Sequence, residues 1–286
     1  MSTKINLIWN EFVYGGHILA IGGSSVAYTG SLLLGVDSSW GFLLMIYFII
    51  QAVYLSDRYL DLKHDSSTNR TRTKYLSRHF KFIPLLIFFY ILFFLVILFS
   101  AESIIAIFFG LGLIGVSLLY ALILKNITKK IPAFKNIFVS LCWASIVILL
   151  ALYYNYSFNI ELILVFSFVF IILFANVSFC DIKDYRGDKK KKILTPAVIF
   201  GKEKLIKILR VIVLVSFLPL IYGVYYGILP EYTLFLFFMI PYIFHYFNKA
   251  ESENCDLNYT TNTLVYGGYI LWGIFIFIGK LIMSHV

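Results

Sequence analysis

Long apolar stretches separated by short polar ones recur along the whole chain. Nine of them are long enough to cross about 30 Å of hydrocarbon as helices, at 12–34, 40–56, 82–101, 103–124, 136–154, 160–180, 205–227, 231–247 and 263–284. The first stretch, with its GGHILAIGGSS centre, and the short eighth, which contains Pro241, fit this pattern least well. The pattern predicts an all-α membrane protein with nine transmembrane helices.

Composition supports this interpretation and excludes a soluble domain. Hydrophobic residues make up 60% of the 286 residues and charged residues only 14%, whereas a soluble domain averages about 25% charged residues. No polar linker divides the chain, so we expect one domain over residues 1–286. The three cysteines, Cys142, Cys180 and Cys255, predict no disulfide framework.

Basic residues between the apolar stretches predict the orientation. Nine crossings sort 23 of the 24 Lys and Arg residues to one side of the membrane and leave only Lys280 towards the other. Because positive charge favours the cytoplasmic side, we expect the N-terminus and the loops after the even-numbered stretches to be cytoplasmic. Topology and attraction to anionic headgroups then explain the net charge of +9, which does not indicate nucleic acid.

Two acidic clusters end the second and sixth apolar stretches and therefore face the same side. The first, in YLSDRYLDLKHD, is Asp57, Asp61 and Asp65, and the second, in FCDIKDYRGD, is Asp181, Asp184 and Asp188. Residues four apart on a helix are rotated by only about 40°, so each cluster shares one helical face.

Carboxylates crowded at a membrane surface are unfavourable unless a cation neutralises them. Mg²⁺ takes one or two carboxylates and keeps its other positions for water and substrate phosphates. Nearby basic residues that suit phosphate oxygens are Arg70, Arg72, Lys125, Lys130 and Lys189. The clusters therefore predict a metal–diphosphate site for an amphiphile with a phosphorylated head and a hydrocarbon tail. The alternative is that the acidic residues form solvated helix ends and the basic residues only anchor the topology.

These motifs resemble those of the UbiA superfamily of intramembrane prenyltransferases. The family's first motif, N-D-x-x-D-x-x-x-D, corresponds to DRYLDLKHD at 57–65, where Asp57 replaces the usual Asn and Arg58 the usual Asp. The second motif, D-x-x-x-D, corresponds to DYRGD at 184–188, and Asp181 stands where Asn is often found. ILTPAVIFGKEKL and LLYALILKNITKKIPAFKNIFVSLCWA also resemble the family's sequence, so the resemblance covers nearly the whole chain.

The resemblance implies a bundle of nine helices around a central cavity, with a cytoplasmic cap, in a bacterial cytoplasmic membrane. It implies an enzyme that moves an isoprenyl group from an isoprenyl diphosphate to a hydrophobic, aromatic acceptor with the help of Mg²⁺. The implied metal ligands are Asp57, Asp61, Asp65, Asp181, Asp184 and Asp188, among which Asp61 and Asp184 are the residues expected to be catalytic. The implied diphosphate ligands are Arg72, Lys125 and Lys130. Asn10 and His17 are candidates for acceptor contact; the alternatives are a helix cap and a structural histidine.

Two other functions compete with prenyl transfer. A membrane terpene cyclase of the same fold would ionise the same donor and let the cation close on its own double bond; the extra aspartate in each motif favours it. A transporter would place carboxylates near mid-membrane between broken helices, whereas these aspartates lie at the ends of their apolar stretches.

Overall fold

The computed structural model is all-helical across the residues that it describes, which are 2–65 and 69–284; at 2–7, 63–65, 70, 125 and 126 only the backbone is described. The elements, in chain order, are α1 (Ser2–Tyr14), α2 (His17–Leu33), α3 (Trp40–Asp65), α4 (Arg70–Arg78), α5 (Ile83–Leu98), α6 (Ile104–Leu122), η1 (Leu124–Lys129), α7 (Phe134–Tyr153), α8 (Ile160–Lys190), α9 (Pro196–Phe200), α10 (Lys202–Ser216), α11 (Leu218–Tyr225), η2 (Glu231–Phe238), α12 (Met239–Glu251), α13 (Leu257–Tyr259), η3 (Thr260–Val265) and α14 (Tyr266–Met283). η1 and η2 are 3-10 helices, and η3 is a π-helical turn.

Within the described residues, six helical segments are long and apolar enough to cross a membrane. They are Trp40–Leu62, Ile104–Leu122, Phe134–Tyr153, Ile160–Lys190, Lys202–Tyr225 and Leu257–Met283. The pair Thr71–Arg78 and Ile83–Leu98 would make a seventh span, but its two helices are bent by 86°. The chain is thus an integral membrane protein, and nine spans and a cap stay predictions.

Two predicted stretches form shorter helices than the sequence suggested. The first stretch is divided at Gly15 and Gly16, so that α2 has 17 residues and α1 precedes it as a separate helix. The eighth stretch becomes the 3-10 helix η2 followed by α12, which has 13 residues. Pro241, which cannot donate a helical hydrogen bond from its backbone nitrogen, sits near the start of α12.

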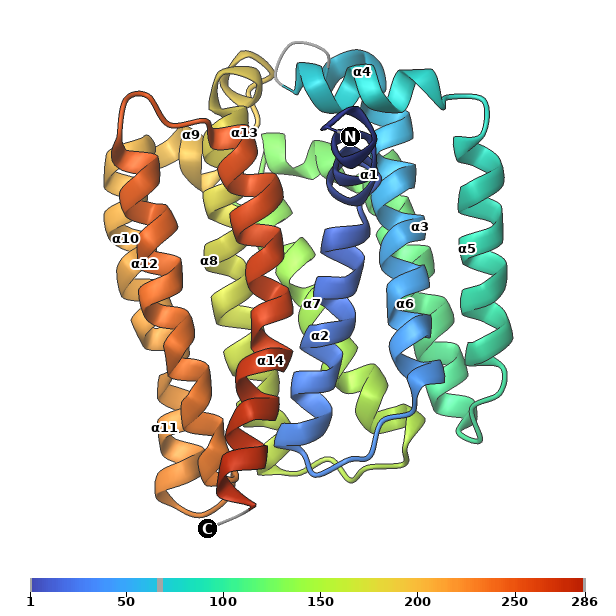
Figure 1. Cartoon of the computed structure of the whole chain (residues 1–286), viewed down its shortest axis with the longest axis vertical. Coiled ribbons are helices and arrows are strands. Elements are labelled where there is room, and N and C mark those ends of the chain that lie inside the picture. The colour runs from blue at the N-terminus through green and yellow to red at the C-terminus, as the bar shows by residue number, and fades with distance from the viewer. Residues whose placement is uncertain (1, 66–68, 285–286) are drawn as a thin grey trace.

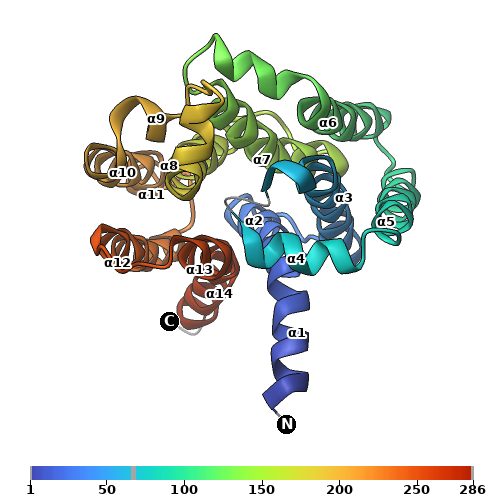
Figure 2. The same ribbon diagram turned by 90° about the horizontal axis from the view of Figure 1, so that it is seen from above.

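The break before α2 follows from glycine geometry. Gly16 has φ of 87°, a backbone conformation that side chains other than hydrogen rarely adopt. A Cβ atom there would lie 2.5 Å from the ring of Tyr54, so only glycine fits against α3. α1 therefore leaves the bundle at an angle and projects outward when the molecule is seen from above (Figure 2).

Small residues let α2 and α14 pack closely although they are far apart in sequence. The Ser25 hydroxyl donates to the Ile270 carbonyl oxygen at 3.0 Å, and the Gly273 amide donates to the Ser25 hydroxyl at 2.9 Å. Small side chains at helix contacts, joined by interhelical hydrogen bonds, are typical of membrane bundles. This contact brings the N-terminal and C-terminal parts of the chain together in one bundle (Figure 1).

The C-terminal ends of α3 and α8, which carry the acidic clusters, lie at the same end of the bundle (Figure 1). α4 lies across that end, which also contains α9 and α13 (Figures 1 and 2). The opposite end holds the α2–α3, α5–α6 and α7–α8 connections. The prediction that both clusters face one side of the membrane therefore agrees with the arrangement of the helices.

Candidate active site

The carboxylate of Asp181 is buried at the contact between α8 and the start of α7. Lys135 Nζ donates to Asp181 Oδ1 at 2.6 Å, and Asn136 Nδ2 donates to Oδ2 at 2.8 Å. Asn136 Nδ2 also donates to the Ser178 hydroxyl at 3.2 Å. Both oxygens of Asp181 are thus occupied by protein donors, and Asp181 is only 2% exposed.

Two backbone hydrogen bonds between loops hold Lys135 and Asn136 in this position. The Ala133 amide donates to the Leu194 carbonyl at 2.8 Å, and the Leu194 amide donates to the Thr128 carbonyl at 3.0 Å. Ala133 itself has φ of 56° and turns the chain into α7. The loop before α7 is therefore fastened to the loop after α8, which fixes the Lys-Asn pair beside the second acidic cluster.

Asp184 and Asp188 differ in how well their oxygens are satisfied. Lys183 Nζ donates to Asp184 Oδ2 at 2.5 Å, and 24% of the Asp184 side chain is exposed. Asp188 is buried, and its Oδ2 has no hydrogen-bond partner in the described part of the chain. A buried carboxylate oxygen without a partner is unfavourable, and an oxygen-binding cation would satisfy it.

The first acidic cluster approaches the second from α3. Asn69, in the segment after α3, donates from Nδ2 to Asp184 Oδ1 at 3.2 Å. Arg58 lies 3.6 Å from Asp57 through its Nη1 atom, and its charge also acts on Asp184. Tyr120 of α6 is within electrostatic range of both Asp57 and Asp181. The two clusters therefore belong to one polar region, although 116 or more residues separate them in the sequence.

Asp61 is half-buried on α3. For Asp65 the structure describes only the backbone. Where side chains are described, no three His, Cys, Asp or Glu residues meet closely enough to hold a metal ion. The members of the inferred ligand set whose side chains are described are therefore not gathered around one point, and the set stays a prediction. The unsatisfied oxygen of Asp188 and the exposed edge of Asp184 are the observations that fit a hard cation with oxygen ligands.

The three predicted diphosphate ligands differ in how far they are buried. Arg72 is 2% exposed, and its guanidinium acts on Tyr14 and Tyr266, so it points from α4 into the molecule. Lys130 is exposed at the end of η1. Lys125 is one of the residues for which the structure describes only the backbone.

Two lysines that contact the carboxylates of α8, Lys135 and Lys183, were not selected from the sequence as site residues. For Lys135, the sequence signal was the Lys-Asn pair at the start of an otherwise apolar stretch, where a charged residue needs a polar partner. Asn69 gave no signal, because it lies in a uniformly polar loop.

A second polar cluster surrounds His17 at the junction of α1, α2 and α3. Glu11 Oε1 accepts a hydrogen bond from His17 Nε2 at 3.2 Å. The other ring nitrogen, Nδ1, lies 2.5 Å from the Tyr47 hydroxyl and 2.8 Å from Gln51 Nε2. Because an amide nitrogen only donates, Nδ1 accepts and Nε2 carries the proton.

The His17 cluster borders a cavity of about 170 Å³ that also contacts His79 and Tyr90. The hydrogen bond from His17 lowers the pKa of the Glu11 carboxyl, so Glu11 stays ionised at neutral pH. Asn10, the residue before Glu11 on α1, is half-buried. The cluster thus places an anionic group and several hydrogen-bonding groups beside a small space at the same end of the bundle as the aspartates.

Comparison with known proteins supports the family resemblance. Residues 17–277 match the sequence model of the UbiA prenyltransferase family. No curated protein matches the chain.

Solved structures agree with that match at the level of the fold. A UbiA homologue from Aeropyrum pernix K1 has a TM-score of 0.70 at 14% identity, over 93% of this chain and 98% of that one. Two structures of a UbiA homologue from Archaeoglobus fulgidus, one bound to DMAPP and Mg²⁺ and one to GPP and Mg²⁺, have TM-scores of 0.65 and 0.66. Both are 15% identical and cover 96% of this chain and 99% of theirs.

Proposed function

Because the chain belongs to the UbiA prenyltransferase family, we propose that it transfers an isoprenyl group from an isoprenyl diphosphate to a hydrophobic, aromatic acceptor. The observation that carries this proposal is a polar region at one end of a membrane bundle, where Lys135 bonds to Asp181 and Asn69, in the segment after the first acidic cluster, bonds to Asp184. The Archaeoglobus fulgidus relatives with bound DMAPP or GPP and Mg²⁺ support the same donor class and the same metal.

In the proposed site, the carboxylates would bind the metal and the cationic side chains would bind the diphosphate. Asp57, Asp61, Asp65, Asp184 and Asp188 would hold Mg²⁺, which neutralises the diphosphate and makes it a better leaving group. Asp181 belongs to the same set by sequence, but its two oxygens already bind Lys135 and Asn136. We therefore assign Asp181 the role of positioning Lys135.

The cationic side chains would bind the diphosphate oxygens. Lys135 lies among the α8 carboxylates and Arg72 points inward from α4, so both are better placed than Lys130, which is exposed. The allylic C–O bond breaks with its electron pair going to the diphosphate, and the acceptor carbon attacks the allylic cation and then loses a proton. Apolar helices exclude water from this cation, and aromatic ring faces stabilise it.

The His17 cluster would bind the polar end of the acceptor. Gln51, which contacts His17, lies six residues before Asp57 on α3, which corresponds to about 9 Å along the helix axis and a third of a turn around it. An acceptor held by His17 and Asn10 would then lie beside α3, less than two helical turns before the first acidic cluster. Its hydroxyl or amino group would donate to Glu11.

The test uses purified protein in lipid nanodiscs with GPP, Mg²⁺ and a lipid extract as the acceptor source. We expect a prenylated product and free diphosphate, both lost in EDTA and in Asp61→Ala and Asp184→Ala. Each variant should lower the rate by about 10²- to 10³-fold, the range found when one charge-stabilising group is removed. Substantial turnover in either variant would contradict the site.

The same assay separates the acceptor and donor sites and the competing reaction. His17→Phe should raise the KM for the extract and leave the KM for GPP unchanged. A cyclic hydrocarbon formed from GPP alone would favour the cyclase over the transferase.

A further inference from the structure

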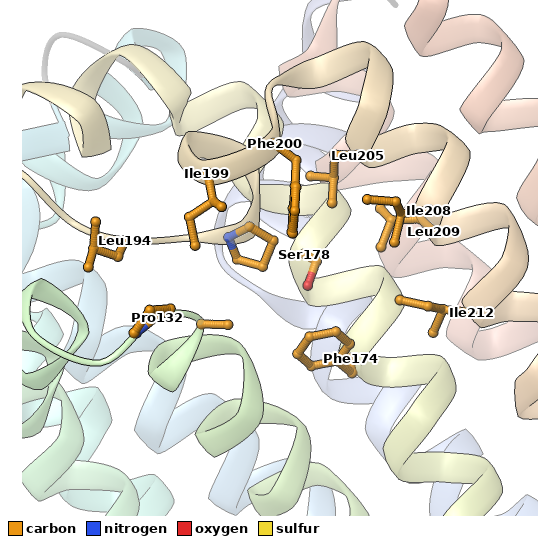
Figure 3. Close-up of a pocket in the computed structure, with 12 residues that line it drawn as sticks. Pro132, Phe174, Ser178, Leu194, Ile199, Phe200, Leu205, Ile208, Leu209 and Ile212 are labelled. Carbon is orange, nitrogen blue, oxygen red and sulfur yellow. The ribbon is translucent and has the colours of Figure 1, made fainter.

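A cavity of about 400 Å³ lies between α8 and the segments on either side of it (Figure 3). Its floor is formed by Phe174 and Ser178 of α8, one wall by Pro132 before α7, and the other wall by Leu205 and Ile208 of α10. Phe200 of α9, a helix at the same end of the bundle as the acidic clusters, lines one edge of the cavity and is 42% exposed. The cavity therefore sits on the outer side of the bundle at one membrane surface.

The lining of this cavity suits hydrocarbon. Apart from Ser178, the side chains that line it are apolar. The Ser178 hydroxyl already accepts a hydrogen bond from Asn136. A sugar, a phosphate or a quinone head would find few partners here, whereas an acyl chain needs none.

Exposed lysines stand next to several lining residues along the chain, and we call them the rim of the cavity. Lys129 and Lys130 precede the wall residue Pro132, and Lys191 and Lys192 precede the lining residue Leu194. On the third side, the ammonium group of Lys204 lies 5.8 Å from the centre of the Phe200 ring. Glu203 is the acidic residue among them. The rim therefore carries five lysines beside an apolar space.

We propose that this cavity binds one anionic phospholipid, with an acyl chain between α7, α8 and α10 and the phosphate on the lysine rim. Basic pockets between membrane helices on the cytoplasmic side attract anionic headgroups, and this rim lies at the end of the bundle that carries nearly all the Lys and Arg residues. The site is separate from the proposed reaction and does not depend on it. Through Asn136, however, its lining residue Ser178 is two hydrogen bonds from Asp181.

The test is native mass spectrometry of the delipidated full chain titrated with dioleoylphosphatidylglycerol or dioleoylphosphatidylcholine. Three variants separate charge from shape. Lys191→Gln/Lys192→Gln/Lys204→Gln removes three rim charges, and Ile208→Trp fills the cavity without changing charge. The matched control, Lys74→Gln/Arg78→Gln/Lys81→Gln, removes three exposed charges from the same end of the bundle but away from the rim.

We expect the wild-type chain to bind one phosphatidylglycerol at least about tenfold more tightly than phosphatidylcholine, because basic residues at a membrane surface each favour anionic lipid. The rim variant should lose this preference and the control should keep it. Ile208→Trp should weaken binding of both lipids. Equal losses in the rim variant and the control would show that only net charge matters and would overturn the proposal. Displacement of the lipid by GPP would overturn it too, because the cavity would then hold the isoprenyl chain.

Discussion

At the scale of single residues, the candidate site depends on how charged side chains are accommodated in a largely apolar chain. Asp181, at 2% exposure, is tolerated because Lys135 and Asn136 take both of its oxygens. Buried carboxylates require such partners. The placement of the aspartates at the ends of two helices was predictable, because their spacing follows helix periodicity. Lys135 was not, because its partner is 46 residues away and spacing says nothing about contacts between different helices.

Replacing Lys135 with methionine should destabilise the fold. The change leaves Asp181 buried without its cation, which costs about 3–5 kcal/mol for a fully buried pair. Because 30% of the Lys135 side chain is exposed, we expect a smaller loss of about 2 kcal/mol. The measurement is SDS-induced unfolding in mixed micelles without Mg²⁺. The control is Lys130→Met, which removes an exposed lysine and should change the free energy of unfolding by less than about 0.5 kcal/mol. Equal effects of the two variants would contradict this account of Asp181.

Asp57 is the second residue whose chemistry can be isolated, because it stands where the family usually has asparagine. If its carboxylate is a metal ligand, the extra charge tightens Mg²⁺ binding. Asp57→Asn should then keep the fold and some activity but require more Mg²⁺ for half-maximal rate. The measurement is the initial rate against Mg²⁺ concentration at fixed donor and acceptor. An unchanged or lower requirement would mean that Asp57, which lies 3.6 Å from Arg58, serves only to position that arginine.

At the scale of elements, glycine decides where the first apolar stretch becomes two helices. The GGHILAIGGSS sequence marked this region as unusual, but the position of the break depends on what faces it. Gly16 lies against Tyr54 and Gln51 of α3. Gly35, after α2, also has a positive φ of 64°, but a Cβ atom at that position would have no neighbouring atom within 4 Å. The sequence alone does not show which of the two glycines is required, whereas the packing of Gly16 against α3 does.

Gly16→Ala and Gly35→Ala test this distinction. Both substitutions force a residue with a Cβ atom into a left-handed conformation, at a cost of about 1 kcal/mol. Gly16→Ala adds a clash with the Tyr54 ring at 2.5 Å, and such overpacking costs a further 1–3 kcal/mol or so. Thermal unfolding of both variants should therefore show a clearly larger loss for Gly16→Ala. A loss of the same size in both would mean that Tyr54 moves aside freely.

At the scale of the whole molecule, periodicity and charge predicted the helical membrane fold, because the bilayer requires long apolar helices. They did not predict the lengths of the irregular elements. The chain bends by 86° between α4 and α5, where it turns at the membrane surface. The 3-10 helix η2 lies between Pro230 and Pro241. At both places several conformations have similar local propensity, so the sequence does not select one. The position of both acidic clusters at one end of the bundle was expected from topology, whereas the contacts of Lys135 and Asn136 with Asp181 and of Asn69 with Asp184 required the structure.

The orientation of the bundle is the last prediction. Positive residues favour the cytoplasmic side, so α4 and the end of α8 should be cytoplasmic and the α5–α6 connection external. In a background without the three native cysteines, Ser77→Cys on α4, Lys190→Cys on α8 and Ser100→Cys between α5 and α6 each place a thiol at an exposed position. A membrane-impermeant maleimide added to intact cells should label only Ser100→Cys. After the membrane is permeabilised it should label all three, which controls for accessibility. If Ser77→Cys and Lys190→Cys reacted in different compartments, the two acidic clusters would lie on opposite sides of the membrane and no common site could form. If both reacted in intact cells, the site would face outward and the charge argument would be wrong.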